Sequence, residues 1–355
     1  MPSLLTLLLL PFSWLYAGVA AVRNWLYDTE WLATTAAAVP LINVGNLRVG
    51  GTGKTPHVAW LVQLLLDAGQ QPAILSRGYG RDTRGFRLAT AADTAATIGD
   101  EPWQHYHEFA GAVPVVVDED RRHGLAELET LPLKISAVVL DDAYQHRRVQ
   151  PSLNVLLTEQ ARPFWQDHVL PAGRLRESRR GARRADVVVV TKCPPTWSEQ
   201  ARREAAAAVH RYTRSNVPVL FSAYEYGNPV AVSGSAAGSG PKPGAEAVLL
   251  TGIAQPQPLI DYLRGAGYRL AQHHRFADHH AFTAAELMAV ADSLAPGQVV
   301  LTTQKDAARL LEPTLRTAVA LLPLFYVPIR VRFLADGAQR LQKLLAPLFI
   351  PRTVA

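Results

Sequence analysis

Cysteine is almost absent from this chain: among its 355 residues there is one, Cys193. A single thiol excludes an internal disulfide and a cluster of metal-binding thiolates, and it fits a reducing compartment. Charged residues are also few, at 19%, against 48% apolar residues. A chain of this length and composition buries a sizeable core, and its length favours two domains over one.

Acidic residues are fewer than basic ones, which gives a formal net charge of +6. A basic surface suits nucleic acid, anionic lipid or a phosphorylated substrate, so charge alone does not choose among them. The basic runs lack interleaved aromatic residues, and the chain has no recognition motif for bases. Nucleic-acid binding is therefore disfavoured.

No charged residue occurs in the apolar stretch 4–22, and no Lys or Arg precedes it as a secretory signal would require. The length of this stretch permits a membrane span. Pro11 interrupts the run, however, and Trp14, Trp25 and Trp31 are placed as in an interfacial segment. We therefore favour a helix that lies in or dips into the membrane face over a true span. An ordinary core helix is the remaining alternative.

Short continuous apolar runs recur through the first two-thirds of the chain, as expected for strands covered on both faces. A helix with one apolar face follows the first strand, and no G-x-G-x-x-G dinucleotide pattern occurs at that turn. We predict a doubly wound α/β/α domain of the P-loop NTPase type at 36–217, after a membrane-associated N-terminal segment at 1–35. The predicted strands are 41–45, 72–76, 113–117, 135–140, 153–158 and 185–190, and the helix is 57–69.

A glycine- and serine-rich stretch separates this domain from a second series of strands and helices. We predict a linker hairpin at 218–245 and a smaller α/β domain at 246–325. The alternating segment 325–333 resembles a strand and could pair with residues 219–226. The rest of 326–355 would then return to the first domain as a C-terminal helix.

The loop "LRVGGTGKT" at 47–55 resembles a phosphate-binding loop, except that Arg48 stands where the usual pattern has glycine. The backbone N–H groups of such a loop surround phosphate oxygens at the start of a helix. We expect Arg48 to point outward and the loop to keep its function. The predicted ligands of ATP and Mg²⁺ are the loop residues Gly50, Gly51, Thr52 and Gly53, the Lys54 ammonium for the phosphates and the Thr55 hydroxyl for the metal.

Two adjacent acids, Asp141 and Asp142, directly follow an apolar run. Phosphoryl transfer needs a carboxylate on the metal at the end of a neighbouring strand. Two neighbouring carboxylates repel each other unless a cation lies between them. We therefore predict that they bind Mg²⁺; a solvated loop is the alternative.

Several segments together resemble the tetraacyldisaccharide 4′-kinase family, the lipid A kinases of Gram-negative bacteria. The apolar N-terminus also fits. The resemblance implies an enzyme on the cytoplasmic face of the inner membrane that transfers the ATP γ-phosphate to the 4′-hydroxyl of a tetraacylated glucosamine disaccharide 1-phosphate. It implies no obligate protein partner. The matching segments are "VGNLRVGGTGKTP", "LSRGYGR", "GDEP", "LDDAYQH", "LPAGRLRE", "FADHHAF" and "LTTQKDA".

The resemblance also implies roles for residues that their surroundings alone would leave as turn acids and surface histidines. Asp100 falls on the position expected to accept the hydroxyl proton, and His279 on the position that holds this carboxylate, with His280 as the alternative. Glu101 and Glu177 fall on polar positions near the metal. Gln304 stands where the family more often has glutamate, which leaves the role of segment 301–307 open.

Two arginine-rich stretches remain, at 77–87 and 174–184. They are either solvated surfaces or sites for phosphate and anionic headgroups; Arg77, Arg174 and Arg176 are the predicted substrate-binding residues. The rival hypothesis is a membrane-associated ATPase switch with a related loop. Such switches carry a lysine just before the two glycines, where this chain has Val49, so the kinase is favoured.

Overall fold

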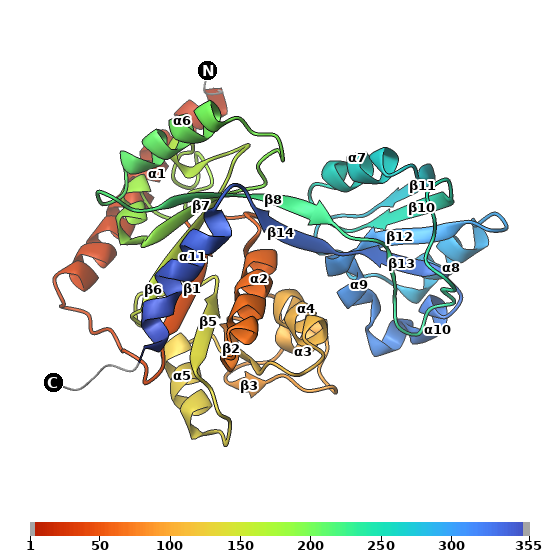
Figure 1. Cartoon of the computed structure of the whole chain (residues 1–355), viewed down its shortest axis with the longest axis horizontal. Helices are drawn as coiled ribbons and strands as arrows, with labels where there is room; N and C mark the ends of the chain where they lie inside the picture. The colour runs from red at the N-terminus through yellow and green to blue at the C-terminus, as the bar shows by residue number, and fades with distance from the viewer. Residues whose placement is uncertain (1–3, 351–355) are drawn as a thin grey trace.

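Two α/β domains and a long N-terminal helix make up residues 4–350, the part of the chain that the computed structural model describes (Figure 1). The large domain contains a nine-stranded sheet in the order β14-β8-β7-β6-β1-β5-β2-β4-β3. Its strands are parallel except at the two edges, where β14 and β3 run antiparallel to their neighbours. The strands are β1 (Leu41–Asn46), β2 (Pro72–Ser76), β3 (Arg87–Leu88), β4 (Val115–Val117), β5 (Ala137–Asp141), β6 (Leu153–Glu159), β7 (Val187–Thr191), β8 (Val219–Tyr226) and β14 (Ile329–Phe333).

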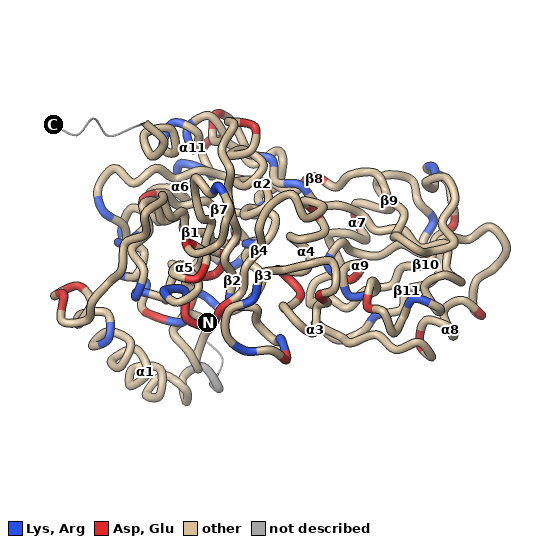
Figure 2. Tube along the Cα trace, turned by 90° about the horizontal axis from the view of Figure 1, so that it is seen from below, with Lys and Arg blue, Asp and Glu red and all other residues tan. Residues whose placement is uncertain are grey.

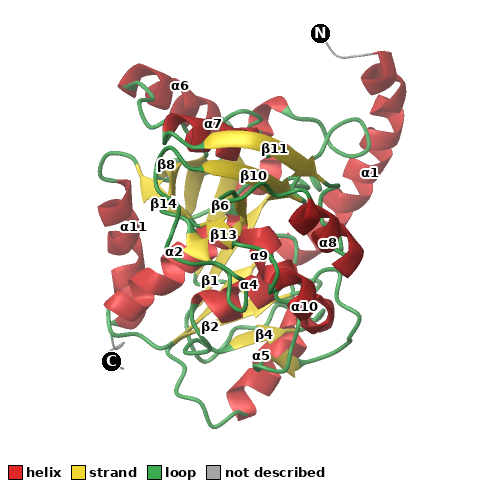
Figure 3. Cartoon of the chain, turned by 90° about the vertical axis from the view of Figure 1, so that its right-hand side faces the viewer, coloured by secondary structure: helices red, strands yellow, loops and turns green. Residues whose placement is uncertain are grey.

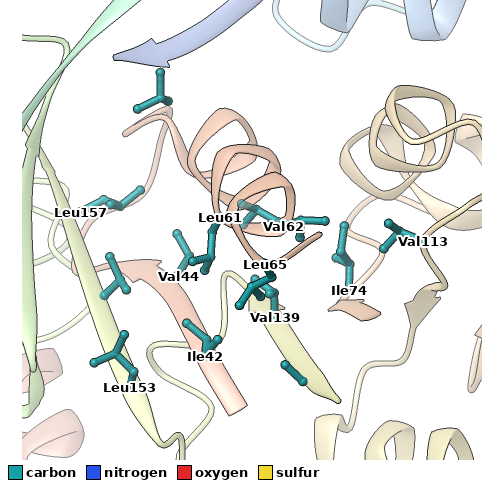
Figure 4. Close-up of a cluster of buried hydrophobic side chains, with 14 of the residues drawn as sticks. Ile42, Val44, Leu61, Val62, Leu65, Ile74, Val113, Val139, Leu153 and Leu157 are labelled. Atoms are coloured by element: carbon teal, nitrogen blue, oxygen red, sulfur yellow. The ribbon is translucent and has the colours of Figure 1, made fainter. Parts of the chain in front are cut away.

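Helices cover both faces of this sheet, as the doubly wound prediction requires. On one face, α2 packs Leu61, Val62 and Leu65 against Ile42 and Val44 of the strand that precedes it (Figure 4). Burial of each such side chain contributes about 1.5–3 kcal/mol. The helices are α2 (Lys54–Asp67), α3 (Ala95–Ile98), α4 (Asp100–Glu108), α5 (Arg121–Thr130), α6 (Glu199–His210) and α11 (Gly337–Leu345), with short 3₁₀ turns at Phe164–Gln166, Arg179–Arg184 and Ala346–Phe349.

The small domain is built on a five-stranded sheet in the order β11-β10-β12-β13-β9. Its helices pack on the two faces of that sheet (Figure 3). The strands are β9 (Val230–Ala231), β10 (Glu246–Thr251), β11 (Arg269–Arg275), β12 (Val299–Thr303) and β13 (Leu324–Val327). The helices are α7 (Gln257–Gly265), α8 (Ala284–Asp292), α9 (Gln304–Leu310) and α10 (Arg316–Val319), with a 3₁₀ turn at Pro313–Leu315.

The chain crosses between the domains along β8 and β14, which pair antiparallel from Tyr226↔Ile329 to Ser222↔Phe333. The linker predicted at 218–245 is therefore wrong in its first part, because β8 belongs to the large sheet. The predicted strand 325–333 is two strands, since Pro328 lacks an N–H and the chain changes sheets there. Its pairing with 219–226 holds for β14, whereas β13 pairs with β12.

α11 returns to the large domain, as predicted for the C-terminal segment. Leu341 and Leu345 are buried in the same core cluster as α2. Figure 1 shows α11 and α2 on the same side of the sheet.

The N-terminal helix α1 (Leu4–Asp28) runs through Pro11 without ending, so this proline interrupts the apolar run but not the helix. A proline can kink a helix without stopping it, and α1 is anchored just beyond it: Ser13 Oγ donates to the Val169 carbonyl at 2.9 Å. Near its C-terminal end, Asn24 donates to Glu177 at 2.8 Å. α1 therefore lies along the large domain.

Most of the large apolar side chains that α1 carries from Leu7 onward are exposed, which contradicts the alternative of a core helix. Figure 2 shows almost no charge along this helix. By length and composition alone it is long and apolar enough to cross a membrane. The exposed side chains are Leu7, Leu8, Phe12, Trp14, Leu15, Tyr16, Val19, Val22 and Trp25.

Candidate functional site

The loop between β1 and α2 has the geometry of a phosphate-binding loop. Gly50 and Gly53 have positive φ angles of +107° and +89°, which glycine adopts without strain. A Cβ atom on Gly53 would lie 2.2 Å from the Tyr224 hydroxyl oxygen. α2 begins at Lys54, directly after the loop, so its first N–H groups and its dipole favour an anion at this position.

Residues at the ends of neighbouring strands hold the loop in place. Asn46 Nδ2 donates to Thr52 Oγ1 at 2.6 Å, and Thr191 Oγ1 donates to the Thr52 carbonyl at 2.8 Å. Lys192 Nζ donates to the Gly51 carbonyl at 2.6 Å. The Thr52 side chain is fully buried. The side chain and the backbone of Thr52 therefore both fix the shape of the loop.

Arg48, the departure from the usual loop pattern, points inward, so the expectation of an outward side chain is wrong. Arg48 is 3% exposed. Its Nη1 atom donates to Glu159 Oε2 at 3.0 Å and to the Arg162 carbonyl at 2.9 Å. Glu159, the last residue of β6, also accepts from Lys192 at 2.9 Å. Arg48 thus supports the loop through Glu159, which lies outside the loop sequence and also binds Lys192.

Asp142 lies beside the loop, at the carboxyl end of β5. Its Oδ2 atom is 3.4 Å from Lys54 Nζ, and both of its oxygens accept from Arg176, each at 3.1 Å. Burial would raise the pKa of Asp142, but Lys54 and Arg176 outweigh it and hold that pKa below its usual value. The carboxylate is therefore ionised and fixed next to Lys54.

Asp141, the last residue of β5, has different partners. It is 3% exposed, and its Oδ2 atom is 3.7 Å from Nε2 of the fully buried His105 on α4. Arg121 is within 3.5 Å of the Asp141 carbonyl oxygen. The two acids are adjacent in the chain, but each is held by its own set of neighbours.

These residues fit a magnesium ion. Thr55 is half-buried, and no hydrogen bond to its hydroxyl occurs within residues 4–350. Mg²⁺ usually takes one or two carboxylates and completes its shell with substrate phosphates and water. Within the described residues, no three His, Cys, Asp or Glu side chains are arranged to hold a metal by themselves. A site that the nucleotide completes is consistent with this arrangement.

Asp100 and His279 meet at the junction of the two domains. Asp100 begins α4 in the large domain, and its Oδ2 atom accepts from His279 Nδ1 of the small domain at 2.9 Å. His279 has a positive φ of +60°, which aims a side chain that follows β11 back at α4. His280 instead bonds to Glu286 at 3.0 Å and stacks on Phe276. The pairing of His279 rather than His280 with Asp100 is as expected; the catalytic role of the pair stays a prediction.

Three residues of α9 complete this junction, and no sequence pattern assigns a role to any of them. Arg309 donates to Asp100 Oδ2 through Nε at 2.9 Å and through Nη2 at 2.6 Å. Lys305 Nζ donates to His279 Nε2 at 3.0 Å, and Asp306 accepts from Arg309 at 2.9 Å. Burial would raise the pKa of Asp100, but His279 and Arg309 outweigh it and hold that pKa far below its usual range. The i, i+4 spacing of the two basic residues just after a strand was the available signal.

The two glutamates expected near the metal lie in different environments. Glu101 is partly exposed, 3.8 Å from Lys305 Nζ. Glu177 is buried and accepts from Arg184 at 2.7 and 2.9 Å, as well as from Asn24 and Gln145. Gln145 also accepts from Arg176. Glu177 therefore reaches Asp142 only through Gln145 and Arg176, and its carboxylate is already saturated.

The arginines predicted to bind substrate also separate into two kinds. Arg77 and Arg174 are exposed, and neither forms an ion pair within residues 4–350. Arg176 is committed to Asp142. Arg77 and Arg174 therefore extend into solvent, whereas Arg176 orients the Asp142 carboxylate.

Comparisons with known proteins agree on one family. A profile of the family described as tetraacyldisaccharide-1-P 4′-kinase matches residues 5–348. The chain is 43% identical over 340 residues to a tetraacyldisaccharide 4′-kinase of Cytophaga hutchinsonii, covering 95% of this chain and 94% of that protein. It is 38% identical over 338 residues to a protein of the same name from Flavobacterium johnsoniae, covering 94% of each.

A similar solved structure is the "apo" form of LpxK from Aquifex aeolicus, crystallised in complex with ATP. Its TM-score is 0.76 at 29% sequence identity, with 98% of this chain and all of the other covered. This chain therefore shares its fold with that protein over nearly its whole length.

Proposed function

Because this chain belongs to the tetraacyldisaccharide-1-phosphate 4′-kinase family, we propose that it transfers the γ-phosphate of ATP to the 4′-hydroxyl of a tetraacylated glucosamine disaccharide 1-phosphate. The observation that carries the proposal is the placement of Lys54 and Asp142, 3.4 Å apart, directly after a glycine loop at a helix start. A lipid kinase needs this arrangement to hold a nucleotide and its metal at one edge of the sheet.

The loop and the paired acids bind the nucleotide. The N–H groups of Gly50, Gly51 and Gly53 would surround the phosphates, and Lys54 would balance their charge; the Thr52 N–H donates to the Gly50 carbonyl at 3.0 Å. Thr55, Asp141 and Asp142 would hold Mg²⁺, which neutralises charge that develops on the transferred phosphoryl group. Arg176 keeps the Asp142 carboxylate in place and ionised.

Asp100 accepts the proton of the attacking hydroxyl. A sugar hydroxyl is a poor acid, so a carboxylate within reach assists as the bond to phosphorus forms. Asp100 Oδ2 is occupied by donors from His279 and Arg309, whereas Oδ1 receives no hydrogen bond from any described residue. Oδ1 is therefore the atom that takes the proton, and His279 orients the carboxylate.

The substrate's acyl chains call for a lipid surface, and α1 supplies the contact. Its exposed apolar face includes Phe12, Leu15 and Val19, between 64% and 71% exposed. Since α1 is bonded along its length to the large domain, we place it in the interface of the cytoplasmic leaflet of the inner membrane. The ATP site then faces the cytosol, and Arg77 and Arg174 are available to substrate phosphate.

A transfer assay tests this function. Purified protein in mixed micelles receives γ-labelled ATP, Mg²⁺ and tetraacyldisaccharide 1-phosphate. We expect label in the lipid, and its loss in an Asp141→Ala variant. ATP hydrolysis without labelled lipid, increasing on bare vesicles, would instead favour the ATPase switch.

A further inference from the structure

Arg309 is buried at the domain junction, and every nitrogen of its guanidinium is engaged. The side chain is 6% exposed. Nε and Nη2 both donate to Asp100 Oδ2, at 2.9 and 2.6 Å, and Nη1 donates to the Gly252 carbonyl and to Asp306, at 3.0 and 2.9 Å. A planar guanidinium with all nitrogens bonded cannot turn without breaking several hydrogen bonds at once. The position of the Arg309 guanidinium therefore fixes the orientation of the Asp100 carboxylate.

Asp306 and Gly252 are the hydrogen-bond partners of Arg309 within the small domain. Asp306 is fully buried and accepts from the Gly252 N–H at 3.0 Å and from Thr303 Oγ1 at 2.8 Å. Both of these donors bond Asp306 Oδ2, and Arg309 Nη1 donates to Oδ1. Arg309 therefore uses Nη1 within the small domain, whereas Nε and Nη2 reach across the junction to Asp100.

The domains are also held together by contacts that do not involve Arg309. Trp103 Nε1 of α4 donates to the Ala308 carbonyl of α9 at 3.0 Å. In Figure 2, charged positions of both signs lie where α4 meets α9. The small domain is therefore held against the large domain by contacts other than those of Arg309. Loss of Arg309 can disturb the Asp100 carboxylate without releasing the small domain.

We propose that Arg309 is a positioning residue for the transfer reaction: it holds the plane of the Asp100 carboxylate so that Oδ1 remains open to the acceptor hydroxyl. Lys305 complements it by donating to His279 Nε2, which assigns the remaining ring proton to Nδ1, the atom that faces Asp100. Segment 301–307, whose role the sequence left open, begins the helix that carries these groups. This inference rests on the proposed function, because it requires Asp100 to take the proton.

Steady-state kinetics of Arg309→Gln and Arg309→Lys test the proposal. Misplacement of a reacting group by about 1 Å can cost about 10²-fold in rate, so we expect Arg309→Gln to lower kcat by about 10- to 100-fold. The KM values for ATP and lipid should change by no more than about twofold, since Arg309 would act on the acceptor only through Asp100. Arg309→Lys should recover part of kcat by restoring one charged donor. Arg316→Ala, an exposed change in the same domain, is the matched control and should leave both constants unchanged.

A double-mutant cycle with Asp100→Ala separates positioning from general support. If Arg309 acts through Asp100, Arg309→Gln should cost no more than about twofold further once Asp100 is gone, because coupled residues are not additive. An equal loss in both backgrounds, or a rise in KM at constant kcat, would overturn the inference. Near-normal turnover of Asp100→Ala alone would instead contradict the proposed role of Asp100. Thermal unfolding of each variant identifies folding failure; if Arg309→Gln does not fold, the Arg309→Lys cycle gives the answer.

Discussion

The two halves of the site are built in different ways. The nucleotide half lies within the large domain, where the loop, Lys54 and Asp142 are set by two adjacent parallel strands and one helix. The acceptor half lies between domains, where Asp100 meets His279 from 179 positions further along the chain. The first half exists as soon as the large sheet forms. The second exists only while the small domain is docked.

This difference separates nucleotide binding from turnover. A kinase that could hydrolyse ATP with its nucleotide half alone would waste it in water. With the proposed base at a junction, transfer would depend on a contact that nucleotide binding does not need. Changes in the first half should therefore damage binding and turnover together, and changes in the second should damage turnover alone.

The largest effect is expected from Asp142→Ala, in the nucleotide half. It removes a metal-site carboxylate and leaves Lys54 and Arg176 without their partner. Since a metal ion supplies several kcal/mol of transition-state stabilisation, we expect kcat to fall by about 10³-fold or more, with weaker binding of Mg²⁺-ATP by calorimetry. Asp82→Ala, an exposed acid of the same domain, is the control. Unchanged affinity for Mg²⁺-ATP would contradict the expectation that changes in the nucleotide half damage binding and turnover together.

Asp100→Ala, in the acceptor half, should act on turnover only. Loss of a general base costs about 10²–10⁴-fold, so kcat for lipid phosphorylation should fall within this range. The Kd of ATP should stay within about twofold, measured on the same preparation. A variant with near-normal turnover would remove Asp100 from its role.

Arg48→Ala tests how much the buried Arg48–Glu159 pair stabilises the domain that carries the nucleotide half. A hydrogen bond to a buried charged group is worth about 1.5–3 kcal/mol, and Glu159 keeps Lys192 as a partner. We expect the large domain to lose about 2 kcal/mol of unfolding free energy. All seven tryptophans lie outside the small domain, at or before Trp197, so their fluorescence in urea follows the unfolding of the large domain together with α1. Arg48→Lys should lose less; equal losses would mean that the charge pair is not what supports the loop.

The smallest effect concerns α1, which belongs to neither half. Leu15 is 71% exposed, and Leu15→Asn removes part of an apolar contact worth about 1.5–3 kcal/mol when fully buried. Partition into anionic vesicles, measured by sedimentation, should weaken about tenfold, equivalent to about 1.4 kcal/mol. ATP affinity should not change. Met288→Asn, an exposed apolar residue of the small domain, should leave partition unaltered, and a similar loss there would argue against α1 as the membrane contact.

The same division explains what the sequence could predict. The nucleotide half was predictable because Lys54 and Thr55 belong to one short pattern and Asp142 follows a strand. The pairing of Asp100 with His279 came only from the family resemblance, since no local pattern relates residues so far apart. Arg309 was missed for the same reason. Arg48 was assigned outward because a loop pattern carries no information about Glu159, which lies 111 positions away.

The strand plan was predictable where valine and leucine runs are buried on both faces, as in β7, and failed where two sheets share a segment. Residues 325–333 alternate like one strand, but Pro328 divides them between two domains. The linker predicted at 218–245 wrongly includes the strand at 219–226, because the glycine- and serine-rich segment that follows this strand dominates the composition of that region. Hydrophobic pattern therefore predicted elements more reliably than domain boundaries.

The insertion of the small domain between β8 and β14 has a consequence for biosynthesis. Chains emerge from the ribosome with the N-terminal end first, so β8 is complete while β14 and α11 are still to be made. Until residues 227–328 have been synthesised, β8 is an open sheet edge, a template for wrong pairing, and the core beside α2 lacks Leu341 and Leu345. Folding of the small domain brings Ile329 next to Tyr226 and thereby shortens the search for the last strand. The domain that carries His279 and Arg309 thus also acts as an internal folding aid for the domain that carries the nucleotide.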